Sequence, residues 1–268
     1  MIYFLLALII LVALYIFLIF PRTFKKPSRA HLMNHYYAHR GLFDNESDAP
    51  ENSLPAFRLA VENGYGIELD VQLSKDKIPV VFHDDTLKRM CDVEGHVWDY
   101  TLEELKKFKL KNSNESIPTF EEALNVIGGK TPIIVEYKLD VVQTEVCRLS
   151  NELLKNYNGP YCIESFHPLA LLWYKKNRPD VVRGQLSKQF WRYKEDRNFP
   201  YLIMSFLLSN VATRPDFIAY KHSDASNISR KLCKLFGGLS VAWTIRSAED
   251  FEKAKDKFDL FIFDSCRL

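Results

Sequence analysis

The chain has 268 residues, of which 47% are hydrophobic and 26% are charged, and its formal net charge is +2. This composition supplies enough apolar side chains for a packed core. The small net charge, without a basic run interleaved with aromatic residues, argues against nucleic-acid binding. The five cysteines have no paired metal-binding spacing, and their odd number favours reduced thiols in a domain that faces the cytosol.

The N-terminal segment from Ile2 to Phe20 is uncharged and almost wholly apolar. As a helix it would be about 28 Å long, close to the ~30 Å hydrocarbon core of a bilayer. The alternative is a cleaved signal peptide, which needs a basic residue before the apolar run and a small-residue cleavage site. The run has no preceding Lys or Arg, and Pro21-Arg22-Thr23-Phe24 is a poor cleavage site. We therefore predict a transmembrane anchor at residues 1–21.

A basic linker is expected at residues 22–34, because four basic residues follow the apolar run within a short distance, namely Arg22, Lys25, Lys26 and Arg29. The positive-inside rule places the chain after the helix in the cytoplasm. We therefore expect a single-pass membrane protein whose residues 35–268 form one cytoplasmic domain, which is an ordinary size for an α/β barrel.

Short apolar runs alternate with amphipathic stretches throughout residues 35–268. The apolar runs predict eight strands, at residues 36–39, 67–71, 133–137, 162–166, 182–186, 217–220, 240–244 and 260–264. The amphipathic stretches predict helices at residues 53–62, 120–127, 141–155, 168–176, 227–236 and 248–257. Alternating strands and helices indicate a parallel sheet, and eight repeats indicate a closed α/β fold, the TIM (β/α)8 barrel.

Two departures from a regular barrel are expected. The connection from Asp85 to about Ser116 is too long for an ordinary loop, so it should form a small excursion over the barrel mouth. The chain stops at Leu268, just after the eighth predicted strand, so residues 28–36 should cover the gap that a closing helix would fill.

Acidic, imidazole and guanidinium side chains gather within one short stretch of the chain, each beside an apolar run. Glu68 and Asp70 are two positions apart, so on a strand they share one face. Two such carboxylates repel each other unless a cation lies between them or they adopt different protonation states. His39, Arg40 and His83 supply proton transfer and anion binding. This set suits metal-assisted chemistry on a phosphate ester.

Seven short motifs occur in a fixed order. They are Ala38-His39-Arg40-Gly41, Pro50-Glu51-Asn52-Ser53, Ile67-Glu68-Leu69-Asp70-Val71, Val81-Phe82-His83-Asp84, Ile117 to Leu124, Ile134-Val135-Glu136-Tyr137-Lys138 and Trp243-Thr244. Together they closely resemble the motifs of the glycerophosphodiester phosphodiesterases, and the resemblance runs from about Tyr37 to Asp264. It implies a TIM barrel that hydrolyses phosphodiesters.

The resemblance implies roles for individual residues. Glu68, Asp70 and Glu136 would form an oxygen-only ligand set, which suits Mg²⁺ or Ca²⁺ rather than Zn²⁺. His39 and His83 match the two histidines that serve as acid and base in the family, and which of them does which is left open.

Two basic residues are expected to bind the substrate phosphate. Arg40 offers a planar fork of donors that suits phosphate oxygens. Lys138 shares a strand face with Glu136, so it would place a second cation near the phosphate.

Three further residues each have two interpretations. Glu51 either belongs to the N-terminal cap of the helix that follows or contacts His39 or the metal, and we favour the contact. Asp84 either orients His83 or begins a turn. Trp243 either fills the core or forms a wall of the site, which its position at a strand end favours.

The sequence thus predicts hydrolysis of a glycerophosphodiester to glycerol 3-phosphate and an alcohol, with water or the substrate's own 2-hydroxyl as nucleophile. One alternative is a lysophospholipase D-type enzyme that acts on membrane lipids, which the anchor and the stretch Phe190-Trp191-Arg192-Tyr193 favour. Another is a catalytically inactive, membrane-tethered barrel that only binds. This last alternative is disfavoured because every motif residue expected for chemistry is present.

Overall fold

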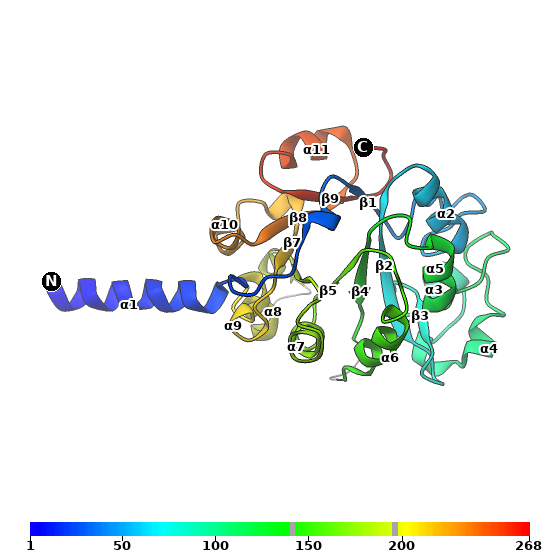
Figure 1. The fold of residues 1–268 in the computed structure, drawn as a ribbon, viewed down its shortest axis with the longest axis horizontal. Helices are drawn as coiled ribbons and strands as arrows, with labels where there is room; N and C mark the ends of the chain where they lie inside the picture. Colours follow the sequence, from blue (N-terminus) through cyan, green and yellow to red (C-terminus); the bar gives the residue numbers. More distant parts are fainter. Residues whose placement is uncertain (140–142, 195–197) are drawn as a thin grey trace.

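Eight parallel strands close into a barrel, because β1 pairs with β9 on one side and with β2 on the other. The structure is a computed structural model that describes residues 1–139, 143–194 and 198–268. The barrel strands are β1 (Tyr36–His39), β2 (Gly66–Leu73), β4 (Ile133–Tyr137), β5 (Tyr161–Ser165), β6 (Arg183–Ser187), β7 (Phe217–Lys221), β8 (Leu239–Ile245) and β9 (Leu260–Phe263). The predicted TIM barrel is therefore confirmed (Figure 1).

Helices cover the outside of the barrel (Figure 1). They include α2 (Leu54–Glu62), α5 (Phe120–Ile127), α6 (Glu145–Leu154), α7 (Pro168–Asn177), α8 (Phe199–Ser205), α9 (Asn210–Thr213), α10 (Ile228–Leu235) and α11 (Ala248–Ala254). The helix predicted at residues 141–155 begins at Glu145, with Thr144 at its N-cap, and Val141 and Val142 lie outside the described residues.

Strand β2 shows how the fold orients the acidic side chains. Ile67, Leu69 and Val71 lie in the large apolar cluster between strands and helices. Since side chains alternate along a strand, Glu68 and Asp70 point the other way, into the barrel. A second apolar cluster, which includes Leu32, Phe217 and Ile262, fills the barrel interior.

The predicted excursion forms a small subdomain with its own apolar cluster. Strand β3 (Pro79–Val81) pairs antiparallel with the end of β2. It is followed by α3 (Lys88–Cys91), the 3-10 helix η2 (Val97–Asp99) and α4 (Leu102–Leu105). The cluster includes Leu87, Met90, Val97, Leu105 and Ile117. Trp98 of this subdomain lines a cavity at the barrel mouth, as the prediction of an excursion over the mouth requires.

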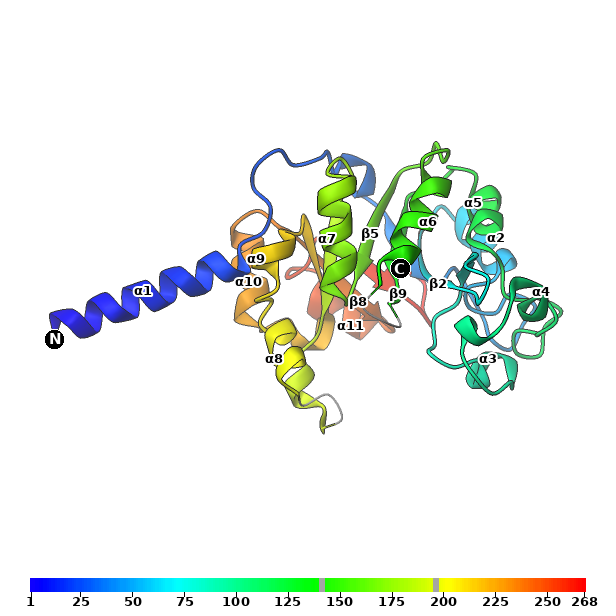
Figure 2. The same cartoon turned by 90° about the horizontal axis from the view of Figure 1, so that it is seen from below.

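The N-terminal helix α1 (Ile2–Ile19) projects away from the barrel, as Figures 1 and 2 show. It is long and apolar enough to cross a membrane. Its last turn is docked on the barrel domain, where Ile19 is completely buried. Asn210 Nδ2 and Cys233 Sγ donate to the carbonyl of Ile19 at 2.9 and 3.2 Å. Arg214 Nη1 donates to the carbonyls of Phe17 and Phe20. These contacts satisfy carbonyls that a helix C-terminus leaves without partners.

The basic linker is bound to the N-terminal end of the barrel. Lys26 Nζ donates to the carbonyl of Gly237, and Arg29 Nη1 donates to the carbonyl of Asp216. Residues 28–36 were expected to cover the outer gap beside the last strand. Tyr36, at the end of this segment, does pack there, against Phe251 and Phe261. Leu32 instead enters the barrel interior, since the apolar cluster there is open at the N-terminal end of the strands.

The docking of α1 predicts the effect of removing one side chain. Arg214→Ala should lower the free energy of unfolding by about 1–2 kcal/mol, because two helix carbonyls lose a charged donor. Protease cleavage between residues 20 and 26 should become faster. The matched control is Lys231→Ala, an exposed basic residue on α10. Equal stability and equal cleavage of the two variants would show that the docked turn is not held by Arg214.

Candidate active site

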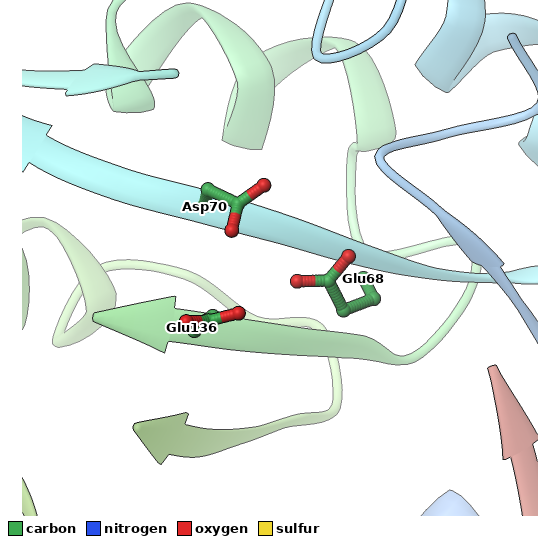
Figure 3. A group of neighbouring side chains, drawn as sticks. All are labelled: Glu68, Asp70 and Glu136. Atoms are coloured by element: carbon green, nitrogen blue, oxygen red, sulfur yellow. The ribbon is translucent and has the colours of Figure 1, made fainter. Parts of the chain in front are cut away.

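Three carboxylates from the neighbouring strands β2 and β4 lie close together, as Figure 3 shows. The strand register pairs Asp70 with Glu136 and places Glu68 two residues earlier on the same face of β2. One oxygen of each of the three side chains lies within 4.8 Å of the others. All three residues are buried. The structure thus brings together the three acids that were predicted as metal ligands.

The protonation of these acids reflects the cost of burying several negative charges together. Burial, reinforced by the charges of Asp70 and Glu136, raises the pKa of Glu68 well above its ordinary value. Burial also opposes the ionisation of Asp70. The charges of Lys138, His83 and Arg40, together with the hydrogen bond from Asn52, outweigh burial and hold the pKa of Asp70 low. The site therefore needs positive charge to hold all three acids ionised.

The donor set fits a hard divalent cation. Glu68 Oε1 is buried and has no hydrogen-bond partner among the described residues. Lys138 Nζ lies 3.1 Å from Asp70 Oδ1 and 2.6 Å from Glu136 Oε1, so its ammonium supplies one positive charge. Carboxylate oxygens alone favour Mg²⁺ or Ca²⁺ over softer ions. Within the described part of the chain, these residues provide the one group of acids that could hold a metal ion.

His39 lies at the end of β1, between two acids. Its Nδ1 is 2.9 Å from Asp264 Oδ2, and its Nε2 is 3.9 Å from Glu68 Oε2. Burial of the imidazole, together with the charge of Arg40, lowers the pKa of His39 to about 4, even though Asp264 opposes this shift. The ring is therefore neutral near pH 7 and is able to accept a proton.

Asp264 is a functional candidate that sequence reasoning missed. It follows β9 directly, so its position at the end of a predicted strand was the available signal. Arg246 donates to both oxygens of Asp264, from Nε to Oδ1 at 2.9 Å and from Nη2 to Oδ2 at 3.3 Å, and Oδ2 is also the oxygen that contacts His39. Asp264 thus positions the His39 ring and fixes which ring nitrogen faces the cavity.

His83 follows β3 and has a carboxylate partner of its own. Its Nδ1 lies 2.7 Å from Asp84 Oδ1, so the structure places Asp84 where it orients the ring. Arg89 holds Asp84 in turn, with Nε donating to Oδ2 at 2.6 Å. The two histidines therefore make the same kind of contact, because a carboxylate lies beside the Nδ1 of each ring.

Glu51 links Arg40, which follows β1, to Arg89 of the excursion. Arg40 Nη1 donates to Glu51 Oε1 at 2.7 Å, and Arg89 donates to both oxygens of Glu51. The helix cap is Ser53, whose Oγ accepts from Ala56 N, so Glu51 has no capping role. Its contact is with Arg40, which differs from the predicted contact with His39 or the metal. Arg89, which lies in the excursion, was not predicted to have a role in the site.

Asn52 and Glu164 are two further residues that sequence reasoning missed. Asn52 Nδ2 donates to Asp70 Oδ2 at 2.9 Å and so orients one of the acids. Glu164, on β5, is a fourth buried carboxylate beside Glu136. Burial and the charge of Glu136 raise the pKa of Glu164 well above its ordinary value. Glu164 lies within the strand that was predicted at residues 162–166.

A cavity of about 120 Å³ joins these groups, lined among others by His39, Arg40, His83, Lys138, Phe166 and Trp243. Trp243 packs edge-on against Phe166, with ring centroids 5.6 Å apart. The structure therefore places Trp243 in the wall of the cavity. The chemistry that this cavity supports is proton transfer and charge stabilisation at a small anionic group.

The Glu51 network predicts a pH-dependent stability. Burial alone would raise the pKa of Glu51, but the hydrogen bonds from Arg89 and the charge of Arg40 outweigh it and lower the pKa to about 2. Ionised Glu51 therefore stabilises the fold above its unfolded pKa of about 4.3, and this stabilisation is lost as the pH falls through about 2.

Glu51→Gln should lower the free energy of unfolding by about 1–3 kcal/mol at pH 7, and by less at pH 3. Urea unfolding at the two pH values measures this difference. Glu46→Gln, an exposed acid in the same loop, is the control. A loss that is equal at both pH values would show that Glu51 does not act through its charge.

Comparisons with known proteins agree with this geometry. A sequence profile of the Glycerophosphoryl diester phosphodiesterase family matches residues 39–255. The chain is 39% identical over 233 residues to a glycerophosphodiester phosphodiesterase of Caldanaerobacter subterraneus subsp. tengcongensis, and the alignment covers 81% of this chain and 87% of that relative. It is also 39% identical over 170 residues to a glycerophosphodiester phosphodiesterase of Bacillus altitudinis, with 58% and 67% of the two chains covered.

Solved structures share the fold. A phosphodiesterase from Oleispira antarctica, solved in complex with the product sn-glycerol-3-phosphate, matches with a TM-score of 0.71 and 28% identity over 87% of this chain and 94% of that chain. A glycerophosphodiester phosphodiesterase from Thermotoga maritima matches with a TM-score of 0.67 and 25% identity over 87% and 95% of the two chains. The chain therefore belongs to the glycerophosphoryl diester phosphodiesterase family.

Proposed function

We propose that this protein hydrolyses glycerophosphodiesters to glycerol 3-phosphate and an alcohol. The proposal rests on one observation. In the barrel of this chain, an acidic triad and two histidines that each contact a carboxylate meet at one small cavity. The sn-glycerol-3-phosphate in the Oleispira antarctica structure is the product that this reaction would release.

Glu68, Asp70 and Glu136 would hold Mg²⁺ or Ca²⁺. When bound, the ion supplies positive charge that stabilises the five-coordinate phosphorus. Arg40 and Lys138 bind the phosphate oxygens, since both line the cavity and carry positive charge.

The two histidines divide the proton transfers. His39, which is neutral near pH 7, takes the proton of the nucleophile. His83, held by Asp84, donates a proton to the leaving alkoxide. Water and the substrate's 2-hydroxyl both suit this arrangement, because either nucleophile loses one proton to His39.

The metal site predicts a loss of both binding and activity. Asp70→Asn should weaken divalent-ion binding and lower kcat by about 10²–10⁴, because the ion supplies several kcal/mol of charge stabilisation. Calorimetric titration with Mg²⁺ and Ca²⁺ measures binding independently of activity. Asp92→Asn, an exposed acid on the excursion, is the control. Full activity of the purified enzyme in excess chelator would contradict the metal proposal.

The assignment of the histidines predicts different responses to the leaving group. Loss of either imidazole should cost about 10²–10⁴ in rate. A p-nitrophenyl ester of glycerol phosphate has an acidic leaving group that needs no general acid, so it should rescue His83→Ala and not His39→Ala. Asp264→Asn should cost about 10–100-fold and resemble His39→Ala in this test, because Asp264 positions His39. Rescue of both histidine variants, or of His39→Ala alone, would overturn the assignment.

We propose that α1 spans a membrane once and that the barrel lies in the cytoplasm. The proposal is supported by the length and composition of α1, by the basic residues that follow it and by the five free cysteines, which suit a reducing compartment. Protease added to intact cells should leave the barrel uncut, whereas lysis should expose it. Trimming of the barrel in intact cells would place it outside.

A further inference from the structure

A cavity of about 410 Å³ lies where α1 joins the barrel, and its lining is basic. Its walls come from the segment that follows α1, from α7, from the start of β6 and from the loop before β7. The lining cations are Arg22, Lys25, Lys175, Arg183 and Arg214. Within the described residues the lining contains no Asp or Glu, so negative charge has to come from outside the lining.

The buried acid Asp216 offsets part of this positive charge. Its Oδ2 lies 3.7 Å from Arg22 Nη1 and 4.0 Å from Arg183 Nη1, so one carboxylate faces two guanidinium groups. Burial lowers the pKa of Arg183 to about 10, the charge of Asp216 opposes this shift, and the charge of Arg22 adds to it. The two guanidinium groups therefore remain only partly compensated.

In the described part of the chain, Lys25, Lys175 and Arg214 form no ion pair with a carboxylate. Lys175 Nζ donates to the carbonyl of Ala212, and Arg214 Nη1 donates to two carbonyls at the end of α1. Burial lowers the pKa of Lys175, and the charges of Arg183 and Arg214 add to this shift. Because neutral carbonyls leave the positive charges uncancelled, an anion in the cavity would be stabilised.

Arg183 gives a second, independent indication of an anion. The residue is 2% exposed, and its Nε and Nη2 donate to the carbonyls of Thr213 and Arg214 at 3.2 and 2.9 Å. Its Nη1 is buried and has no hydrogen-bond partner among the described residues. An unpaired donor on a buried charged group is costly, and an anion in the cavity would offer it an acceptor oxygen.

If α1 spans a bilayer, the cavity lies at the level of the lipid headgroups. Its lining begins at Phe20, directly after the last residue of α1. Headgroups add about 5–8 Å on each side of the ~30 Å hydrocarbon core. The end of α1 is docked on α9 and α10, beside which both views show it, so the cavity is held next to this layer (Figures 1 and 2). Phe20 and the exposed Phe24 add aromatic rings to the lining, which suit the boundary between headgroups and hydrocarbon.

We propose that this cavity binds the phosphate of an anionic phospholipid, such as phosphatidylglycerol, in the leaflet that faces the barrel. The lipid phosphate would accept from Arg183 and pair with Lys25 and Lys175. This inference uses the proposed membrane insertion of α1 and does not depend on the proposed reaction. Arg183 begins β6, whereas His39 ends β1, so the lipid site and the histidine lie at opposite ends of the barrel. A lipid bound there would help the docked α1 to fix the barrel relative to the bilayer.

The test is calorimetric titration of the full-length protein in neutral-detergent micelles, with a chelator present so that metal-dependent hydrolysis does not occur. The probes are short-chain phosphatidylglycerol, short-chain phosphatidylcholine and inorganic phosphate. The Kd for phosphatidylglycerol should be at least about tenfold lower than that for phosphatidylcholine, because the choline cation cancels the phosphate charge. Inorganic phosphate should bind more weakly than phosphatidylglycerol, because it does not enter the micelle surface beside α1.

Two double variants locate the binding. Lys25→Gln combined with Lys175→Gln should raise the Kd for phosphatidylglycerol by about 25-fold, or about fivefold for each charge removed. The matched control combines Lys176→Gln with Lys231→Gln, two exposed lysines on α7 and α10 outside the cavity lining, and should change this Kd by less than about threefold. Hydrolysis of glycerophosphocholine in the presence of Mg²⁺ should stay within about twofold for both variants, which also shows that they are folded.

Equal affinity for the two phospholipids would overturn the lipid site. Equal weakening by the two double variants would also overturn it, because that result indicates diffuse attraction to a basic surface. If inorganic phosphate binds as tightly as phosphatidylglycerol, with the same dependence on Lys25 and Lys175, the cavity binds a free anion and the lipid is the wrong ligand. Absence of glycerophosphocholine hydrolysis by the unchanged protein would contradict the proposed function and leave the lipid site standing.

Discussion

Mutual repulsion among buried carboxylates is the constraint on which the rest of the site depends. Two charges about 4.8 Å apart repel by about 3–4 kcal/mol at an effective dielectric constant of about 20. The pairing of β2 with β4 brings oxygens of Glu68, Asp70 and Glu136 within this distance of one another, and Glu164 lies beside Glu136. A barrel interior that contained these acids alone would be unstable, so the neighbouring residues have to supply positive charge or protons.

The surrounding residues reduce this repulsion in two ways: neighbouring cations offset part of the negative charge, and a raised pKa favours a proton on one acid. Lys138 places its ammonium between Asp70 and Glu136, and Arg40 lies 3.6 Å from Asp70. Among the residues that the structure describes, Glu68 has no side-chain cation as close as these, and its pKa is raised. A divalent ion bound by the triad would remove the remaining repulsion, and the same ion would provide the charge that phosphodiester cleavage needs. One ion bound there would thus serve both stability and chemistry.

Arg89 of the excursion links the residues that hold Arg40 and His83 beside the acidic triad. Arg89 binds both Glu51 and Asp84, so one side chain links the partner of Arg40 to the partner of His83. The position of a histidine that follows β3 is thereby set relative to an arginine that follows β1. This network explains why a short stretch of sequence with several charged residues folds into one cavity rather than several separate ion pairs.

Sequence reasoning predicted the parts of this arrangement that depend on local patterns. The alternation in Ile67-Glu68-Leu69-Asp70-Val71 gives both the strand and the inward direction of its acids. Asp264, Arg89 and Glu164 were missed because their roles arise from contacts between elements far apart in the chain. The same holds for α1, whose composition predicted an apolar helix, whereas its docking on Asn210 and Arg214 depends on packing that no local pattern records. The entry of Leu32 into the barrel interior was missed for a related reason, since topology alone does not tell which opening of a barrel a short segment fills.

A crystal structure of the protein soaked with Ca²⁺ and glycerol 3-phosphate tests the central claim most directly. We predict an anomalous-difference peak about 2.3–2.6 Å from oxygens of Glu68, Asp70 and Glu136, with a phosphate oxygen of the ligand completing the coordination. A structure in which the ligand binds and these three carboxylates contact no metal ion would contradict the account.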